Sequence, residues 1–473
     1  MNKYKQLATN TIIFAIGSFS SKILSFLLTR LYTASMTEAQ LGVADLVVQG
    51  ANLLIPILTL NIVESVMRYG LENSYDKQQV FSVGIRIMLM GMAAMTLLLP
   101  VLNFVPSFDG YLHLLYIFVF TSSFRAINQQ FLRTCGHVKL YAFDGILTTF
   151  VMIILNFIFL LGFDMGTEGY LLSMILADLI SALFIFFVGQ NYRYLKFVRI
   201  EKDMLKTMVK FSIPLIPTAV LWWVVSSSDK FMISGMLGDD INGVYGVAYK
   251  IPSLISMVST IFFQAWQMSA IKEYTEGGAS DEAKNFFSKV FHAYQAVMYI
   301  SGGAILLLLR PLITLFVDSD FGDPYIYTPF LILSVIMSCS CTFLSYIYSA
   351  TVHTKNSFAT SLLAAIVNII LNLILIPSPL GAQGAAIATA ASYSICFIVR
   401  LFDSRRYIHF KVNYVKLILN IVLIVASTLV TLYTAKFKTL IMIILFIAIF
   451  IINFSELWMT VKKVMPISRR KKA

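Results

Sequence analysis

The sequence has little charge and few cysteines. Only 13% of its 473 residues are Asp, Glu, Lys or Arg, whereas soluble domains carry about 25%. With 58% hydrophobic residues and a mean hydropathy of +0.80, the chain is predicted to have lipid as its main solvent. A disulfide framework is typical of short secreted chains, so the four cysteines, which lie in or beside apolar segments, are expected to be small buried residues. They are Cys135, Cys339, Cys341 and Cys396.

Sequence motifs of enzyme active sites are also missing. The chain has no HExxH, GxSxG, Walker A or GxGxxG pattern, and its five histidines are scattered without ligand spacing. We therefore predict a protein that is not an enzyme and that needs no cofactor or metal. Without an ATP-binding motif, any transport is expected to use an ion gradient, the membrane potential or the gradient of the substrate.

Long apolar runs fill most of the chain. A membrane-spanning helix needs about 20 mostly apolar residues, and this pattern predicts fourteen spans joined by short connections. The first run contains Lys22 and is longer than the apolar part of a typical signal peptide, so it is expected to be retained as a span. The predicted spans are 9–32, 41–66, 80–100, 111–131, 141–162, 168–189, 211–234, 243–268, 290–310, 328–350, 357–377, 382–402, 415–435 and 439–459.

The distribution of Lys and Arg predicts the orientation. If the N-terminus is cytoplasmic, 27 of the 36 Lys and Arg fall in inside segments and three in outside segments. This asymmetry follows the positive-inside rule and predicts that both termini lie on the cytoplasmic side of the membrane. The net charge of +12 is then a topology signal that needs no nucleic-acid partner, and the basic tail 469–472 is expected to lie against anionic lipid headgroups.

The two halves of the chain resemble each other. The sequence after Arg30 aligns with that after Lys230, Gly42 aligns with Gly243, and VMIILNFIFL (151–160) resembles VNIILNLILI (367–376). Six spans return the chain to the same side, so the copies form a parallel repeat, as in transporters with a substrate path between two halves. The predicted parts are a bundle 1–190, a basic linker 191–210, a second bundle 211–402, and 403–473 with two further spans and the basic tail.

Polar side chains recur at helical spacing in two repeat-related spans. Steps of three and four residues place them on one helix face, which either packs on another helix or lines an aqueous path. We interpret the two stripes as the lining of a path, with kinks at Pro56 and at Pro214 and Pro217. The predicted lining residues are Gln49, Asn52, Ser253, Thr260 and Gln264.

Ionisable residues inside the spans are the strongest sign of function. Each costs about 2.5–3.5 kcal/mol or more at a helix centre facing lipid, so most must face a cavity or form pairs. Arg86, Asp144 and Glu64 are expected to snorkel or pair near the cytoplasmic interface, and Asp229 and Lys230 to form a local neutral pair. The predicted basic cavity comprises Lys22, Arg30, Arg125, Lys230 and Lys250.

Such a cavity would favour an anion, for example a lipid pyrophosphate whose tail stays in the bilayer while its head crosses. Asp45, Asp178 and Asp229 could hold the basic residues in place or bind a coupling cation, H+ or Na+. The sequence leaves both roles open.

The stretch SSSDKFMISGMLGDDINGVYGVAYKIPSL (226–254) resembles the central signature of bacterial polysaccharide transporters. The opening FAIGSFSSKILSFLLTRLYT with LGVADL, and QAWQMSAIKEY (264–274), are similar to theirs, although Met268 stands where the family often has Pro. The resemblance covers almost the whole chain. It indicates the oligosaccharide flippase branch of the multidrug, oligosaccharidyl-lipid and polysaccharide (MOP) exporter superfamily. Charge is common in that family at the positions of Lys22, Arg30, Asp229, Lys230 and Lys250.

The resemblance implies alternating access of two bundles. The implied substrate is an undecaprenyl-diphosphate-linked oligosaccharide repeat unit, moved to the outer leaflet for O-antigen or capsule. Membrane lipids, and a polymerase and glycosyltransferases, would then be partners. The alternatives are a flippase for the peptidoglycan lipid precursor and a cation-coupled multidrug exporter, for which an acidic, aromatic cavity would be expected. A membrane-embedded polymerase or glycosyltransferase would need a larger outer loop than residues 311–327.

Overall fold

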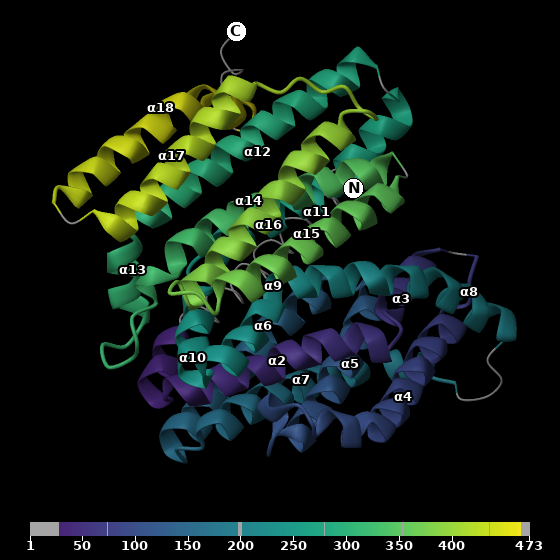
Figure 1. Ribbon diagram of the computed structural model, residues 1–473. Coiled ribbons are helices and arrows are strands. Elements are labelled where there is room, and N and C mark those ends of the chain that lie inside the picture. The colour runs from purple at the N-terminus through teal and green to yellow at the C-terminus, as the bar shows by residue number, and fades with distance from the viewer. Residues whose placement is uncertain are drawn as a thin grey trace, which may run out of the picture. The chain divides into compact units, whose positions relative to one another are not determined.

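The computed structural model is built from helices joined by short connections, with no strand among the residues it describes (Figure 1). These residues are 28–72, 74–196, 201–278, 280–351, 353–434 and 436–464. The prediction of an all-α membrane fold is confirmed. Eleven helices of this described part are long and apolar enough to cross a membrane. The chain is therefore a multi-pass membrane protein.

Helices occupy thirteen of the fourteen predicted spans. The predicted span 9–32 lies mostly outside the described residues, and the spans 111–131 and 243–268 are helical without being among the eleven. The span 243–268 is two helices, α10 and α11, because residues 249–252 form a turn that includes Pro252.

The first compact unit consists of Met1–Gly246 with Phe316–Gly322. Its longer helices are α2 (Glu38–Leu58), α3 (Ile62–Leu71), α4 (Lys77–Leu102), α5 (Leu112–Thr134), α6 (Val138–Asn156), α7 (Gly166–Val188), α8 (Lys202–Ser212), α9 (Ile216–Leu237) and most of α10 (Asp239–Ala248).

Local sequence accounts for how α2 begins and ends. The Thr37 hydroxyl accepts a hydrogen bond from Gln40 N at 3.2 Å, and the Gln40 side chain accepts one from Thr37 N at 3.0 Å. This capping box satisfies two donors of the first turn. Pro56 lies in the last turn, and Leu60 and Asn61 adopt positive φ between α2 and α3. The predicted span 41–66 is therefore interrupted by a turn at residues 59–61. This turn follows Pro56, whereas a proline disrupts the helical turn before it, and α2 is continuous through that turn.

The second compact unit consists of Val247–Leu315 with Asp323–Ala473. Its helices are α11 (Ser253–Gly277), α12 (Asp281–Leu307), most of α13 (Leu309–Phe316), α14 (Thr328–Ala350), α15 (Thr354–Leu375), α16 (Ala382–Ser404), α17 (Tyr414–Tyr433) and α18 (Lys438–Val464). The two units are defined by which residues contact each other, whereas the predicted bundles 1–190 and 211–402 were defined by the sequence repeat. The two criteria differ, so the predicted boundaries stay predictions.

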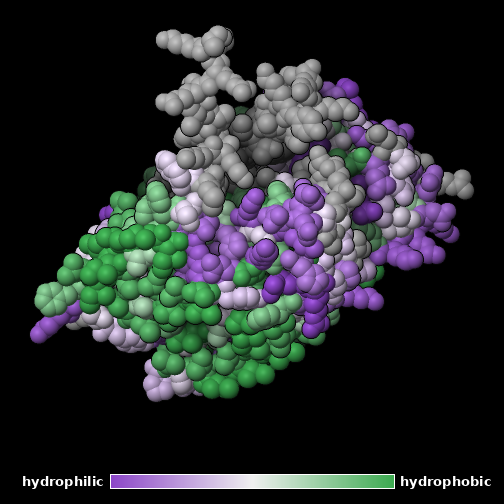
Figure 2. All heavy atoms as spheres, turned by 90° about the horizontal axis from the view of Figure 1, so that it is seen from above, coloured by the Kyte–Doolittle hydropathy of each residue, from purple (hydrophilic) through white to green (hydrophobic). Residues whose placement is uncertain are grey.

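The last two helices have apolar side chains on their exposed faces and polar side chains on their buried faces. Ile418 on α17 and Ile451 on α18 are 58% and 67% exposed, while Asn420 and Asn453 on the same helices are buried. Apolar side chains also gather in a broad area on the face drawn in Figure 2. So large an apolar surface marks contact with a membrane or a partner, and the helix lengths identify the membrane.

Candidate functional site

The strongest candidate site in the first unit is an ion pair between α2 and α9. The Lys230 ammonium lies 2.7 Å from Asp45 Oδ2, with only 8% and 18% of the two side chains exposed. At about 1.5 Å per residue, the position of Asp45 is about 10 Å from the first residue of α2. Lys230 lies at a similar distance from the end of α9. The pair is thus well inside the membrane thickness.

Polar side chains surround this ion pair. Gln49 donates to Asp45 Oδ1 at 3.2 Å and accepts from the Ser227 hydroxyl at 3.1 Å. Asp229 is fully buried and accepts from the Tyr245 hydroxyl at 2.7 Å and from the backbone N–H of Lys230 at 3.0 Å. The Lys230 ammonium thus contacts Asp45 of α2, while Asp229 contacts the Lys230 backbone and Tyr245 of α10; the expected ion pair of Asp229 with the Lys230 ammonium stays a prediction.

Close backbone packing brings these helices together. A Cβ added to Gly42 would lie 2.2 Å from the carbonyl oxygen of Asp239, and one added to Gly243 would lie 1.9 Å from that of Glu38. The Asn242 side chain donates to the Gly42 carbonyl at 3.1 Å. Gly42 and Gly243 are residues that the internal repeat aligns.

A second charged centre joins α5, α6 and α7. Arg125 forms ion pairs with Asp144 at 2.9 Å and Asp178 at 3.2 Å, and its Nε donates to the Ser181 hydroxyl at 2.9 Å. Asp178 also accepts from the Ser122 hydroxyl at 2.5 Å. Asp144 was expected to snorkel or to pair, and it is paired: its fully buried carboxylate contacts the Arg125 guanidinium.

Among the described residues, each centre has a cation in contact with aspartates. The Lys230 ammonium contacts Asp45 and its backbone N–H contacts Asp229, while Arg125 lies between two aspartates. Removing one member of a buried charge pair leaves the other without compensation.

The other predicted site residues are dispersed. Arg30 and Asn52 are exposed, and Lys250 is half-buried in the turn between α10 and α11. The hydroxyls of Ser253 and Thr260 donate to backbone carbonyls of Lys250 and Ser256, at 2.5 and 2.8 Å. Lys22 and the side chain of Gln264 lie outside the described residues. The structure assigns none of them a ligand, so their roles stay predictions.

Arg400 is a buried cation in the second unit. It lies on α16, is fully buried, and donates to Cys341 O at 3.0 Å and to Thr360 Oγ1 and Ser361 Oγ, both at 2.8 Å. It thus joins α14, α15 and α16, as Arg125 joins α5, α6 and α7. Its place one turn before the end of α16 made it indistinguishable from an interfacial arginine in the sequence.

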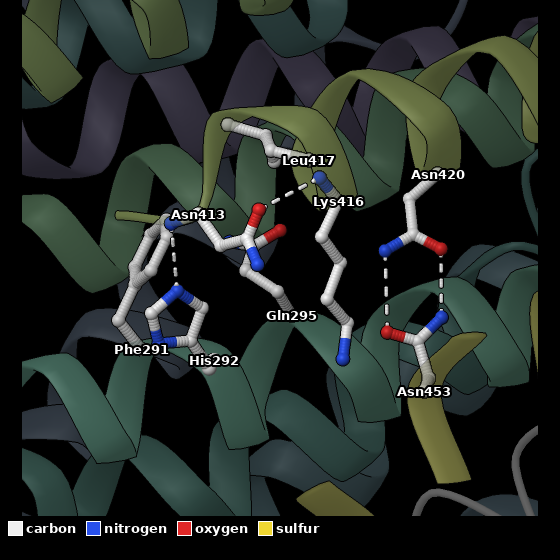
Figure 3. Close-up of a pocket in the computed structure, with 8 residues that line it drawn as sticks. All are labelled: Phe291, His292, Gln295, Asn413, Lys416, Leu417, Asn420 and Asn453. Carbon is white, nitrogen blue, oxygen red and sulfur yellow. Dashed lines mark hydrogen bonds between the residues drawn. The ribbon is translucent and has the colours of Figure 1, made fainter. Parts of the chain in front are cut away.

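A small cavity in the second unit is lined by α12, α17 and the segment before α17, with Asn453 of α18 (Figure 3). Asn420 and Asn453 pair through two hydrogen bonds of 3.2 and 2.7 Å, and His292 accepts from Asn413 N at 3.0 Å. The cavity volume of about 10 Å³ holds at most one water molecule. These residues fasten α17 and α18 to α12, and the space is too small for a substrate.

A family model matches the chain over residues 7–267, more than half of its length, and describes a polysaccharide biosynthesis protein. A search of curated proteins finds no significant match.

Solved structures match over most of the chain. The structure titled lipid II flippase MurJ, inward closed conformation, has a TM-score of 0.70 at 16% identity, covering 95% of this chain and 99% of that one. An inward-facing multidrug resistance MATE family transporter of the MOP superfamily has a TM-score of 0.66 at 15% identity, covering 83% and 97%. A MOP superfamily transporter from Pyrococcus furiosus has a TM-score of 0.62 at 16% identity, covering 84% and 95%. Identities this low show the fold, which is that of MOP superfamily transporters.

Proposed function

The chain belongs to the polysaccharide biosynthesis protein family, and we propose on this premise that it flips a lipid-linked oligosaccharide across the membrane. The family match over residues 7–267 carries the proposal. The substrate would be an undecaprenyl-diphosphate-linked repeat unit, moved from the inner to the outer leaflet of a bacterial cytoplasmic membrane by alternating access. The products would be capsule, O-antigen or related polymers, with polymerase and glycosyltransferases as partners.

The charge network between α2 and α9 supports a diphosphate as the transported head. Lys230 is the cation of this network, and its ion pair with Asp45 joins residues 185 positions apart in the chain. A diphosphate could replace Asp45 as the partner of Lys230, because both present anionic oxygens to the ammonium. The polyprenyl tail would remain in lipid, so only the polar head needs a path through the protein.

Asp45 also supports coupling to a cation. Protonation of Asp45 would remove the charge that holds Lys230, and would release the ammonium for the substrate. Na+ bound among Asp45 and Asp229 would act in the same direction. We propose H+ or Na+ as the coupling ion for this reason.

Two other functions of the same fold are second candidates. The fold match to an inward-facing multidrug resistance MATE family transporter favours a cation-coupled drug exporter. The fold match to the structure titled lipid II flippase favours a flippase for the peptidoglycan precursor.

Flipping in proteoliposomes distinguishes these candidates. Purified protein would be offered a fluorescent polyprenyl-diphosphate oligosaccharide, a lipid II analogue or a cationic drug, with and without a proton or sodium gradient. We expect protein-dependent flipping of the oligosaccharide lipid, and its loss in Lys230→Ala. The matched control is Lys284→Ala, which also removes a lysine from an ion pair, with Asp281 at 2.9 Å, but where the Asp281 side chain is 88% exposed.

Each outcome points to one candidate. Drug movement without lipid movement would replace the proposal with the exporter, and faster movement of the lipid II analogue would replace it with the precursor flippase. Equal flipping by Lys230→Ala and Lys284→Ala, at equal amounts of folded protein, would exclude Lys230 from the substrate path.

A further inference from the structure

A groove separate from the charged centres lies along α15 and α16 in the second unit. Its volume is about 410 Å³, which is within the range of small-molecule sites. Residues from both helices line it, among them Asn356 and Ala359 of α15, and Ile398, Phe402, Asp403 and Arg406 of α16 and the turn after it.

The groove changes from apolar to polar along its length. Ile398 and Phe402 lie one turn apart on one face of α16, about 6 Å along the helix axis. Ile398 and Phe402 are 49% and 57% exposed, so the apolar walls face the lipid, while Arg406 lies beyond the helix end.

The polar end is held by contacts from three helices. Asp403 Oδ2 accepts hydrogen bonds from the Tyr348 hydroxyl of α14 and from Asn356 Nδ2 of α15, both at 2.8 Å. Asn356 also donates to the Tyr407 hydroxyl at 2.9 Å. These contacts fix the position of Asp403 and therefore of the groove's polar end.

Arg406 lies at this polar end with most of its surface accessible. Its side chain is 78% exposed, and Nη1 is 3.5 Å from Asp403 Oδ1, an ion pair longer than a hydrogen bond. A guanidinium has five N–H donors in a planar arrangement that matches a phosphate. An arriving phosphate could therefore bind Arg406 without breaking the hydrogen bonds that hold Asp403.

We propose that this groove binds an anionic membrane phospholipid, with its phosphate on Arg406 and an acyl chain along Phe402 and Ile398. The change from apolar to polar along the groove matches that along a lipid, which has its phosphate at the interface and its chains toward the centre of the bilayer. The positive charge at this end comes from Arg406, whose guanidinium remains 78% exposed beside Asp403. Basic pockets between membrane helices are typical sites for anionic headgroups. The site is independent of the transported substrate.

Native mass spectrometry of the full-length protein with added phosphatidylglycerol or phosphatidylethanolamine tests this proposal. We expect phosphatidylglycerol to be retained more strongly than phosphatidylethanolamine. One basic residue near a membrane surface contributes about 1 kcal/mol, so Arg406→Ala should lower retention about fivefold. Ala359→Trp leaves the charges in place but fills the groove, and should also lower retention.

Arg310→Ala is the matched control. Arg310 is also an exposed arginine of the second unit, with 63% of its side chain accessible and Asp323 as its ion-pair partner. This variant should retain phosphatidylglycerol like the wild type. Size-exclusion profiles and melting curves would confirm that all variants are folded, which the exposure of Arg406 and Ala359 favours.

Three results would overturn the proposal. Equal loss in Arg406→Ala and Arg310→Ala would show a nonspecific charge effect, and full retention by Ala359→Trp would place the lipid elsewhere. Displacement of phosphatidylglycerol by a polyprenyl diphosphate at equal concentration, dependent on Arg406, would assign the groove to the transported substrate. A photoreactive phosphatidylglycerol should label residues 398–406 of the wild type if the proposal holds.

Discussion

Replacing Gly243 with alanine should separate α10 from α2. The added Cβ would lie 1.9 Å from the carbonyl oxygen of Glu38, whereas carbon–oxygen contacts between packed backbones are about 3.3 Å or longer. One of the two helices must therefore move by about 1.4 Å. The clashing atom belongs to the backbone and cannot rotate away.

The expected change in the free energy of unfolding of Gly243→Ala follows from two opposing effects. Overpacking a tight contact costs about 1–3 kcal/mol, and alanine in place of glycine inside a helix returns up to about 1 kcal/mol. We expect a net loss of about 1–2 kcal/mol in the free energy of unfolding.

Gly235→Ala is the matched control, because Gly235 is also helical and a Cβ there would meet no atom within 4 Å. It has the same gain in helix propensity without the clash, so it should be as stable as the wild type or more stable.

The assay is thermal unfolding in detergent, followed by the circular dichroism of the helices. Gly243→Ala should melt below the wild type and Gly235→Ala at or above it. Gly42→Ala should lower the melting temperature as Gly243→Ala does. The double variant should lose less stability than the two single variants together, because both substitutions disturb one contact. If Gly243→Ala melted at or above Gly235→Ala, the close contact of α2 and α10 would be refuted.

Three further predictions concern buried polar groups. Arg125→Met leaves the buried carboxylate of Asp144 without a cation and should lower the free energy of unfolding by about 3–5 kcal/mol, measured by thermal or denaturant unfolding. Asn420→Leu alone leaves the buried Asn453 side-chain oxygen without the donor at Asn420 and should cost about 1–3 kcal/mol, whereas the double variant with Asn453→Leu should recover most of this loss in the same assay. Arg400→Lys cannot reproduce the branched contacts of a guanidinium, so it should lower the melting temperature; an unchanged melting temperature would show that those contacts contribute little.

The sequence by itself determined where the helices lie along the chain and that lipid surrounds them. A bilayer requires about 20 apolar residues per span and internally satisfied backbone hydrogen bonds, so apolar length alone located thirteen of the fourteen predicted spans as helices. The family resemblance rested on the sequence signature at 226–254. Such a signature can be recognised without knowing how the helices pack.

The partners of the buried charges were decided only by the tertiary structure. Neighbouring residues on a helix do not face each other, so the adjacency of Asp229 and Lys230 could not reveal that Asp45, on another helix, lies 2.7 Å from the Lys230 ammonium. Likewise, Asp144 looked interfacial by its position, and its burial depends on how α6 packs against α5 and α7. Apolar length is a property of each segment, whereas a pairing depends on the rotation and depth of two helices, and these are fixed only when the helices pack.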